Sequence, residues 1–244
     1  KAFIYEDAAH AFGATFPDGT KVGSCKYSDM TIFSFHPVKS IAMGEGGVIT
    51  TNNKKIFQRL LILRNSGIEK ERSNFIYKDK SKEKEIDNPW YYEMQELGYH
   101  YRITDIQCAL GLSQLKKINK FLTKRKNLAK RYDRELKDLQ NCKIIHEGLR
   151  NNSSNHLYIL NINFKKLGIT RGKLMSLLKS KEIGTQVHYI PVPSHPYFKN
   201  KGFNNNNLPN SYEYYESALS IPLYYDLTRK QQTHVINQVK KLIG

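Results

Sequence analysis

Cysteine is scarce in this sequence of 244 residues, which contains only Cys25, Cys108 and Cys142. Their number is odd, and their spacing matches neither a metal site nor a C-x-x-C motif, so we predict no disulfide framework and no metal site. Reduced thiols of this kind are typical of a cytoplasmic protein. No run of about eighteen apolar residues occurs either, and the sequence therefore predicts no membrane span.

Acidic residues are in the minority, because 22 Asp and Glu stand against 39 Lys and Arg, for a net charge of +17 at pH 7. Such a charge favours anionic partners. The lysines are mixed with acidic residues, as in "KDKSKEKE", and are not clustered with aromatic residues as in a platform for nucleic acid. Nucleic acid is therefore the less favoured partner, and small anionic substrates such as nucleotide-linked ones fit the charge.

The first half of the sequence alternates short apolar runs with turns that contain glycine. The runs "AFIY", "TIFSF" and "GGVITT" are typical of strands, and "KKIFQRLLILRN" has its apolar residues at helical spacing. This order predicts part of an α/β sheet. The segment 69–88 is mostly charged, and we expect a solvated loop or lid there.

A long helix is predicted to follow, because Thr104 and Gln107 form a capping-box pattern ahead of regularly spaced apolar residues. We expect it to extend toward Leu139, either unbroken or with one break. The boundary between two domains is predicted within it, which divides the chain into residues 1–125 and 126–244.

The second half reads as a small α+β unit. "HLYILNINF" and "GTQVHYIPV" alternate as strands, "TRGKLMSLLKSKEI" has helical spacing, and a second capping box at Thr228 and Gln231 predicts a final helix.

Lys39 stands out within "FSFHPVKS", residues 33–40, because it follows the strand-like "MTIFSF" and precedes the glycine-rich "GEGG". Open α/β sheets bind ligands beyond the carboxyl ends of their strands, so Lys39 is expected at a ligand-binding edge. An amine is nucleophilic only when unprotonated, and a catalytic lysine therefore needs a site that lowers its pKa. Taken alone, this position also fits an ordinary solvated lysine.

Asp7 follows the strand-like "AFIY" and precedes the helix-like "AAHAF". An enzyme that uses pyridoxal phosphate needs a carboxylate against the pyridine nitrogen, because a protonated nitrogen makes the ring an electron sink. Asp7 fits this need, and it fits a helix N-cap equally well. His10 can stack on a ring and the Ser34 hydroxyl can hold a phosphate oxygen, but both also fit ordinary structural positions.

Several stretches carry a resemblance when they are taken together and in order: "EDAAHAFGA", "VGSCKYSDMTIFSFHPVKSIAMGEGGVITT", "GYHYRITDIQCALGLSQL", "VHYIPV" and "ALSIPLYYDLT". They resemble the DegT/DnrJ/EryC1/StrS family of nucleotide-sugar aminotransferases over essentially the whole chain. The resemblance implies an α/β fold of type I, as in transferases that use pyridoxal 5'-phosphate. Residues 1–125 would be the C-terminal part of the large domain, with a mixed sheet, and residues 126–244 the small C-terminal domain.

The same resemblance implies roles for individual residues. Lys39 would be the Schiff-base lysine and the proton carrier of the transamination. Asp7 would pair with the pyridine nitrogen, His10 would stack on the cofactor ring, and the Ser34 hydroxyl would bind the cofactor phosphate.

The resemblance further implies a homodimer with sites at the subunit interface. His100 and Arg102 of "GYHYR" would reach into the partner subunit's phosphate or substrate site, and His188 and Tyr189 would lie near the sugar. The amino donor would be L-glutamate, and the acceptor would be the 4-keto group of a UDP-linked deoxysugar.

The sequence departs from the family pattern in three respects. Family members carry an N-terminal portion with a Gly-Ser/Thr turn that helps to hold the phosphate, and no counterpart is present, so we expect a fragment with an incomplete site. The family commonly has asparagine at the position of His100 and histidine at that of Ser66. Besides an aminotransferase, two alternatives stay open: a sugar dehydratase, which has histidine at the position of Lys39, and a binding or regulatory protein.

Overall fold

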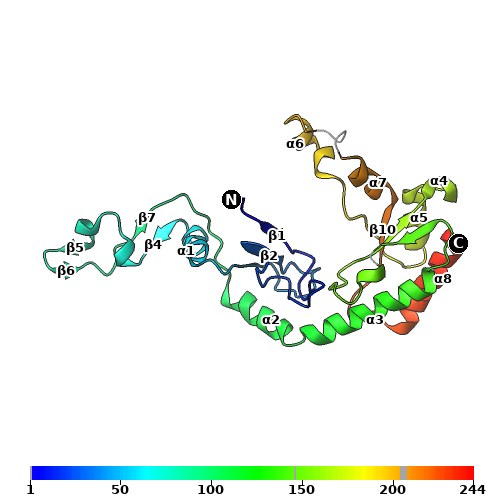
Figure 1. Cartoon of the computed structure of the whole chain (residues 1–244), viewed down its shortest axis with the longest axis horizontal. Coiled ribbons are helices and arrows are strands. Elements are labelled where there is room, and N and C mark those ends of the chain that lie inside the picture. The colour runs from blue at the N-terminus through cyan, green and yellow to red at the C-terminus, as the bar shows by residue number, and fades with distance from the viewer. Residues whose placement is uncertain (1, 146, 204–207) are drawn as a thin grey trace. The chain divides into compact units, whose positions relative to one another are not determined.

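The computed structural model describes residues 2–145, 147–203 and 208–244. The chain divides into two compact units, one formed by Lys1–Phe12 and Thr20–Lys116, the other by Gly13–Gly19 and Lys117–Gly244. Figure 1 shows the order of the elements along the chain. None of the helices in the described ranges is both long enough and apolar enough to span a bilayer.

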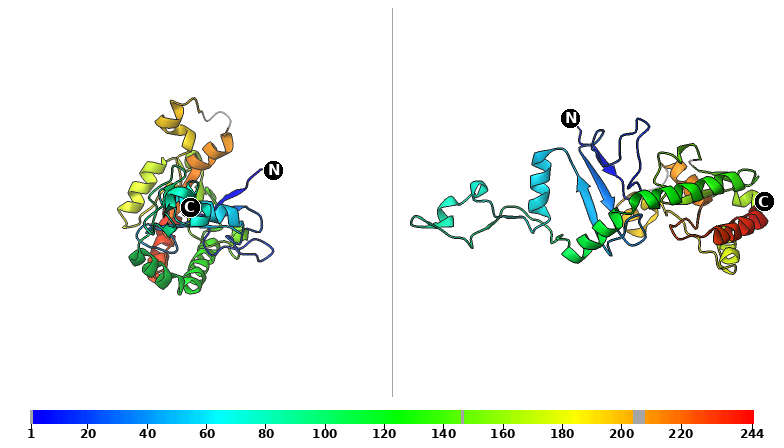
Figure 2. Two further views of the ribbon diagram at one scale, coloured as in Figure 1. Left: turned by 90° about the vertical axis from the view of Figure 1, so that its left-hand side faces the viewer. Right: turned by 90° about the horizontal axis from the view of Figure 1, so that it is seen from below.

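The first unit contains a three-stranded mixed sheet in the order β1-β2-β3. Its strands are β1 (Tyr5–Asp7), β2 (Met30–Ser34) and β3 (Gly47–Thr50). β1 runs parallel to β2, and β3 runs antiparallel to it. All three predicted strands are present, although β1 lies further along the chain than "AFIY". The right-hand view of Figure 2 shows α1 beside these strands.

Two helices belong to this unit, α1 (Lys54–Leu63) and α2 (Asp105–Leu115). The Asn53 side chain caps α1, because its Oδ1 accepts from two backbone amides of the first turn. The predicted capping box of α2 is confirmed, with the side chains of Thr104 and Gln107 each accepting from the other's backbone amide.

The segment between these helices is largely exposed, as its charge predicted. It contains two 3-10 helices, η1 (Arg72–Asn74) and η2 (Lys78–Ser81), and four two-residue strands, β4 (Ile68–Glu69), β5 (Lys82–Glu83), β6 (Ile86–Asp87) and β7 (Glu93–Met94). The carboxylate of Glu93 fixes one end of this loop, because it accepts hydrogen bonds from the amides of Ile76 at 2.7 Å and Tyr77 at 2.8 Å.

The longer segment of the second unit contains α3 (Ile118–Leu136) as its first helix, so the predicted long helix has a break between α2 and α3. Its other helices are α4 (Phe164–Leu167), α5 (Arg171–Lys179), α6 (Pro196–Lys199), α7 (Pro209–Ser217) and α8 (Arg229–Ile243), with 3-10 helices η3 (Glu147–Leu149) and η4 (Val192–Ser194). The second predicted capping box is confirmed at the start of α8, between Thr228 and Gln231.

An antiparallel sheet in the order β10-β9-β8 lies in this unit. Its strands are β8 (Cys142–Ile144), β9 (Tyr158–Ile162) and β10 (Ala218–Ile221). Leucine, isoleucine and tyrosine side chains from the sheet and from α3, α5 and α8 form one buried core. Burial of this apolar surface is the main force that holds the unit together.

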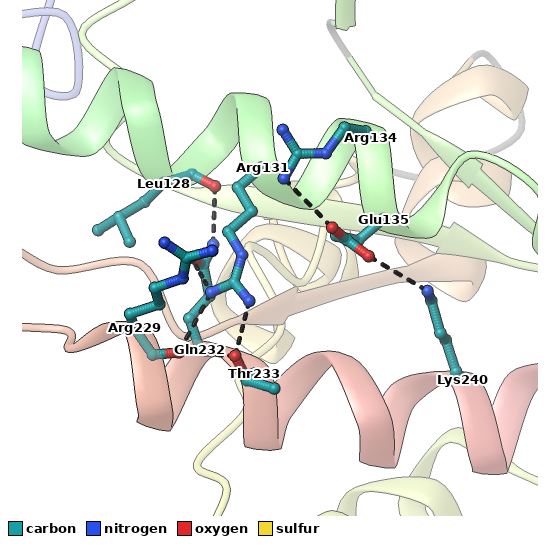
Figure 3. A network of polar contacts seen from close by, with 8 residues as sticks. All are labelled: Leu128, Arg131, Arg134, Glu135, Arg229, Gln232, Thr233 and Lys240. Atoms are coloured by element: carbon teal, nitrogen blue, oxygen red, sulfur yellow. Dashed lines mark hydrogen bonds and ion pairs between the residues drawn. The ribbon is translucent and has the colours of Figure 1, made fainter.

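Polar contacts join α3 to α8, and Figures 1 and 2 show these two helices side by side. The Arg131 guanidinium donates to Gln232 Oε1 at 3.1 Å and to Thr233 Oγ1 at 2.6 Å, as Figure 3 shows. The buried Gln232 amide in turn donates to the carbonyl of Leu128 at 2.8 Å. These bonds fix the register of the two helices, since buried polar groups need specific partners.

Two predictions of secondary structure are wrong. Residues 8–12, read as helix-like, form turns. Residues 184–192, read as a strand, form none, because only Gln186 pairs with the sheet, exchanging backbone hydrogen bonds with Ser220 of β10. Beyond it, Pro191 has no N–H to donate, and the exposed side chains of Tyr189 and Ile190 give this segment no buried face.

Candidate active site

Lys39 lies in the loop that follows β2, where the sequence predicted it. Its backbone amide donates to the carbonyl of His36 at 2.9 Å, which forms a tight turn directly before the lysine. Partial burial of the ammonium group lowers its pKa, and the negative charge of Asp7 acts in the opposite direction. The amine therefore gives up its proton more easily than an ordinary surface lysine does.

Asp7 is the last residue of β1, and it is paired in register with Ile32 of β2. Its Oδ1 accepts a hydrogen bond from the amide of Ala9 at 3.1 Å. The helix that would have made Asp7 an N-cap is absent, so this short turn takes its place. Because β1 and β2 are parallel, their carboxyl ends meet at one edge of the sheet, and this brings Asp7 toward the loop of Lys39.

Ser34 ends β2 two residues after Ile32, so it lies on the same face of the sheet as Asp7. Its hydroxyl accepts from the amide of His36 at 3.4 Å. His10 lies in the turn after Asp7. Three residues of the predicted set, Asp7, Ser34 and Lys39, thus gather at one edge of this sheet.

His100 and Arg102 belong to the same unit but are held by the end of α1. The Arg102 guanidinium donates to Asn65 Oδ1 at 2.7 Å and lies 2.6 Å from His100 Nε2. The backbone of this segment also pairs with Asn65 and its neighbours. Both side chains are exposed, and their polar contacts within the described chain are with each other and with Asn65.

A tight crossing of two backbones holds this segment in place. A Cβ added to Gly67 would lie 1.7 Å from the carbonyl oxygen of Glu96, and one added to Gly98 would lie 2.1 Å from the amide nitrogen of Gly67. Gly67 also has φ +72°, which favours glycine. Side chains at either position would therefore displace the strand-like segment that carries His100 and Arg102.

His188 and Tyr189 lie in the second unit. His188 Nδ1 lies 2.7 Å from the Ser220 hydroxyl, and the exposed Tyr189 ring lies nearly perpendicular to the His188 ring. Hydrogen bonding to β10 thus orients the histidine. That His188 and Tyr189 lie near the sugar remains a prediction.

Sequence reasoning assigned no role to His36 and Glu45, which stand on either side of Lys39. The His36 imidazole lies 3.7 Å from the Glu45 carboxylate. No spacing rule predicts this pair, because eight residues separate them and their side chains approach only when the loop closes.

The model of the DegT/DnrJ/EryC1/StrS aminotransferase family matches residues 1–240. The chain belongs to this family.

The curated proteins that are similar to this chain carry several different descriptions. MJ1066 of Methanocaldococcus jannaschii, described as uncharacterized, is 38% identical over 99% of this chain and 60% of its own length. The spore coat polysaccharide biosynthesis protein SpsC of Bacillus subtilis is 34% identical over the same shares. The UDP-4-amino-4,6-dideoxy-N-acetyl-beta-L-altrosamine transaminase of Campylobacter jejuni is 35% identical over 95% of this chain and 56% of its own length. The chain thus spans about 60% of the length of the curated relatives it matches.

Solved structures confirm the predicted fold. PseC of Helicobacter pylori, an aminotransferase involved in the biosynthesis of pseudoaminic acid, has a TM-score of 0.85 at 28% identity, over 99% of this chain and 59% of its own. Spr1654 of Streptococcus pneumoniae, in its PLP form, has a TM-score of 0.81 at 27% identity, over 98% and 57%. The chain therefore has part of a type I aminotransferase fold with a mixed α/β architecture.

The family uses pyridoxal phosphate, and Spr1654 is also known in its PMP form. The residues at the sheet edge fit this group. They include an amine with a lowered pKa, a carboxylate close enough to act on its charge, and a hydroxyl on the same face as that carboxylate.

Proposed function

We propose that this chain is part of an aminotransferase that moves an amino group from L-glutamate to the 4-keto group of a UDP-linked 4-keto-6-deoxy-N-acetylhexosamine, in the pseudaminic acid pathway. Glutamate would leave as its 2-oxo acid, and the sugar's carbonyl oxygen would leave as water. The observation that carries the proposal is the meeting of Asp7, Ser34 and the loop of Lys39 at the carboxyl edge of β1 and β2, where partial burial also lowers the pKa of Lys39. The choice of sugar is supported by the likeness of "FSFHPVKS" and "PWYYEMQELGY" to the altrosamine transaminases.

Each residue at the edge has a separate task in this proposal. Bound pyridoxal phosphate supplies an electron sink and carries the amino group between the two substrates. Lys39 would anchor the cofactor and then, as a free amine, would carry a proton between the two carbon atoms that exchange it in the transamination. The Asp7 carboxylate holds a proton on the ring nitrogen, the Ser34 hydroxyl donates to the phosphate, and His10 covers one face of the ring.

The remaining predicted residues have roles that require more than this chain. We propose that the enzyme is a homodimer, and that His100 and Arg102 act at the partner subunit's phosphate or substrate site. His188 and Tyr189 would contact the sugar. Residues 1–125 would be the C-terminal part of the large domain and residues 126–244 the small domain. The net charge of +17 would attract a diphosphate-linked sugar.

The runner-up is a sugar dehydratase of the same fold. Such an enzyme has histidine at the position of Lys39, so the lysine opposes it. The other alternative is a catalytically incomplete fragment that acts as a binding or regulatory protein, because the chain spans only about 60% of the length of its curated relatives.

The first experiment is to incubate the chain with pyridoxal phosphate, reduce it with borohydride and map the labelled peptide. The proposal expects the label on Lys39, its loss in Lys39→Ala, and its retention in Lys26→Ala, an exposed lysine elsewhere in the same unit. The same experiment on the chain with upstream sequence restored follows if no label appears. Label spread over surface lysines in that longer protein would refute the proposal.

The substrate is tested on the longer protein. With L-glutamate and the UDP-linked 4-keto sugar, mass spectrometry should detect the amino sugar and the 2-oxo acid in equal amounts. Loss of water from a sugar nucleotide without glutamate would indicate the dehydratase. Tight sugar-nucleotide binding without turnover would indicate the binding protein.

A further inference from the structure

The loop that carries Lys39, residues 35–46, is closed at its base. We call it the lysine loop. The amide of Phe35 donates to the carbonyl of Gly46 at 2.9 Å, and the amide of Met43 donates to the carbonyl of Phe35 at 3.0 Å. Phe35, Ile41 and Met43 are buried. The loop is therefore a packed structure whose shape depends on what its buried side chains contact.

Helix α2 contacts this loop through Gln107, the second residue of the capping box. Its Oε1 accepts from the backbone amide and the hydroxyl of Thr104, which completes the cap. Its Nε2 donates to the carbonyl of Glu45 at 2.9 Å. One side chain thus ties the start of α2 to the lysine loop, a contact that a capping box does not require.

One turn further along α2, the buried Gly111 leaves space for Met43. A Cβ added to Gly111 would lie 2.7 Å from Met43 Sδ and 2.9 Å from its Cγ and Cε. These distances are too short for real carbon atoms, so Met43 can keep this side-chain conformation against the helix only because residue 111 has no side chain.

The contacts continue from Glu45 to Lys39 itself. The Glu45 carboxylate faces the His36 imidazole, and the carbonyl of His36 accepts from the backbone amide of Lys39. A displacement of Glu45 or Met43 would therefore be transmitted to the turn that presents the lysine.

We propose that Gln107 and Gly111 of α2 are positioning residues for Lys39, holding the lysine loop through Glu45 and Met43. The inference rests on the proposed function of Lys39 as the reacting amine. Neither residue touches the site itself. The alternative is that both contacts only stabilise the packing of α2.

The test is the reactivity of the Lys39 amine without any cofactor. The chain is labelled with trace acetic anhydride at a series of pH values, and the label on Lys39 is measured against that on Lys26 by mass spectrometry. In Gly111→Ala the loop is displaced and Lys39 becomes more exposed to water, so its apparent pKa should rise. Labelling of Lys39 near pH 8, relative to that of Lys26, should then fall about threefold or more.

Two control variants, the double variant of Met43 with Gly111 and the single variant Thr104→Ala, separate a positioning role from general packing. Met43→Ala added to Gly111→Ala restores the space and should restore the pH profile toward that of the wild type. Thr104→Ala and Gln107→Ala both break the capping box, but only Gln107→Ala loses the bond to Glu45, so only Gln107→Ala should change Lys39 labelling. Circular dichroism checks that each variant is folded.

The outcomes are distinct. Unchanged Lys39 profiles in folded Gly111→Ala and Gln107→Ala would overturn the inference, as would equal changes in Thr104→Ala and Gln107→Ala. The readout needs neither cofactor nor sugar, so a shifted profile supports the positioning role even if borohydride fixes no pyridoxal phosphate on Lys39. Absence of label on Lys39 in the chain with upstream sequence restored as well would refute the proposed function alone.

Discussion

The buried pair of Arg150 and Asp133 should be the costliest polar contact to break in the second unit. Both residues are more than nine-tenths buried, at 5% and 7% exposure. The guanidinium donates to both carboxylate oxygens, with Nε to Oδ2 and Nη2 to Oδ1 each at 3.0 Å. The Tyr158 hydroxyl donates to the same carboxylate at 2.9 Å, and the guanidinium lies 4.7 Å from the Tyr158 ring centroid.

We expect Arg150→Met to lower the free energy of unfolding by about 3–5 kcal/mol, because it leaves a buried carboxylate without its cation. The methionine keeps most of the side-chain volume, so a cavity adds little. Since whole domains are stable by only about 5–15 kcal/mol, such a loss is large. Asp133→Asn combined with Arg150→Met removes both charges, so the double variant should be less destabilised than the sum of the two single ones.

The assay is urea unfolding followed by far-ultraviolet circular dichroism. Arg134→Met is the matched control: this exposed arginine of α3 pairs with Glu135 at the surface, and its loss should cost less than about 1 kcal/mol. A cost for Arg150→Met no larger than for Arg134→Met would refute the reasoning, and so would full additivity in the double-mutant cycle.

Three further predictions concern pH and capping. Burial opposes ionisation of Glu93, but four hydrogen bonds outweigh it and hold its pKa at about 2. The loop that Glu93 fixes should therefore stay closed above pH 4.5 and open as the pH falls toward 2, which hydrogen exchange should show as a fall in the protection factors of its amides. Burial raises the pKa of Tyr132 and Tyr158, so above about pH 10 these tyrosines ionise in the unfolded state before they do in the folded state. The free energy of unfolding should then fall by about 1.4 kcal/mol per pH unit for each tyrosine. A free energy of unfolding that does not change with pH in urea titrations would contradict this. Thr228→Ala should lower the free energy of unfolding by about 1 kcal/mol and Thr228→Ser should leave it almost unchanged, because a serine hydroxyl can also accept from the backbone amide of Gln231 at the start of α8.

Local chemistry made much of the fold predictable. Both capping boxes, at Thr104 and Thr228, depend on residues three positions apart, and the structure contains both. The strand before Lys39 and the helix after Asn53 follow from short-range periodicity in the same way. The expectation that Lys39 lies at the carboxyl end of a strand needed only this local pattern and the general rule for α/β sheets.

One failure arose where a partner distant in the sequence decides, and the other where a nearby side chain bonds the backbone. Residues 184–192 alternate like a strand, but they meet β10 only at Gln186, and a strand needs a neighbour along its length. Residues 8–12 suit a helix by composition, but the Asp7 carboxylate bonds the amide of Ala9 and favours a turn.

By itself, then, the sequence determined the capped helices, the strand ahead of Lys39 and the family to which the chain belongs. Only the tertiary structure brought Asp7 to the loop of Lys39, through the parallel pairing of β1 with β2. It alone placed Gln107 on Glu45, 62 residues away in the chain, and paired Arg150 with Asp133. The physical reason is that periodicity and capping act over a few residues, whereas burial and charge act between groups that only the folded backbone brings together.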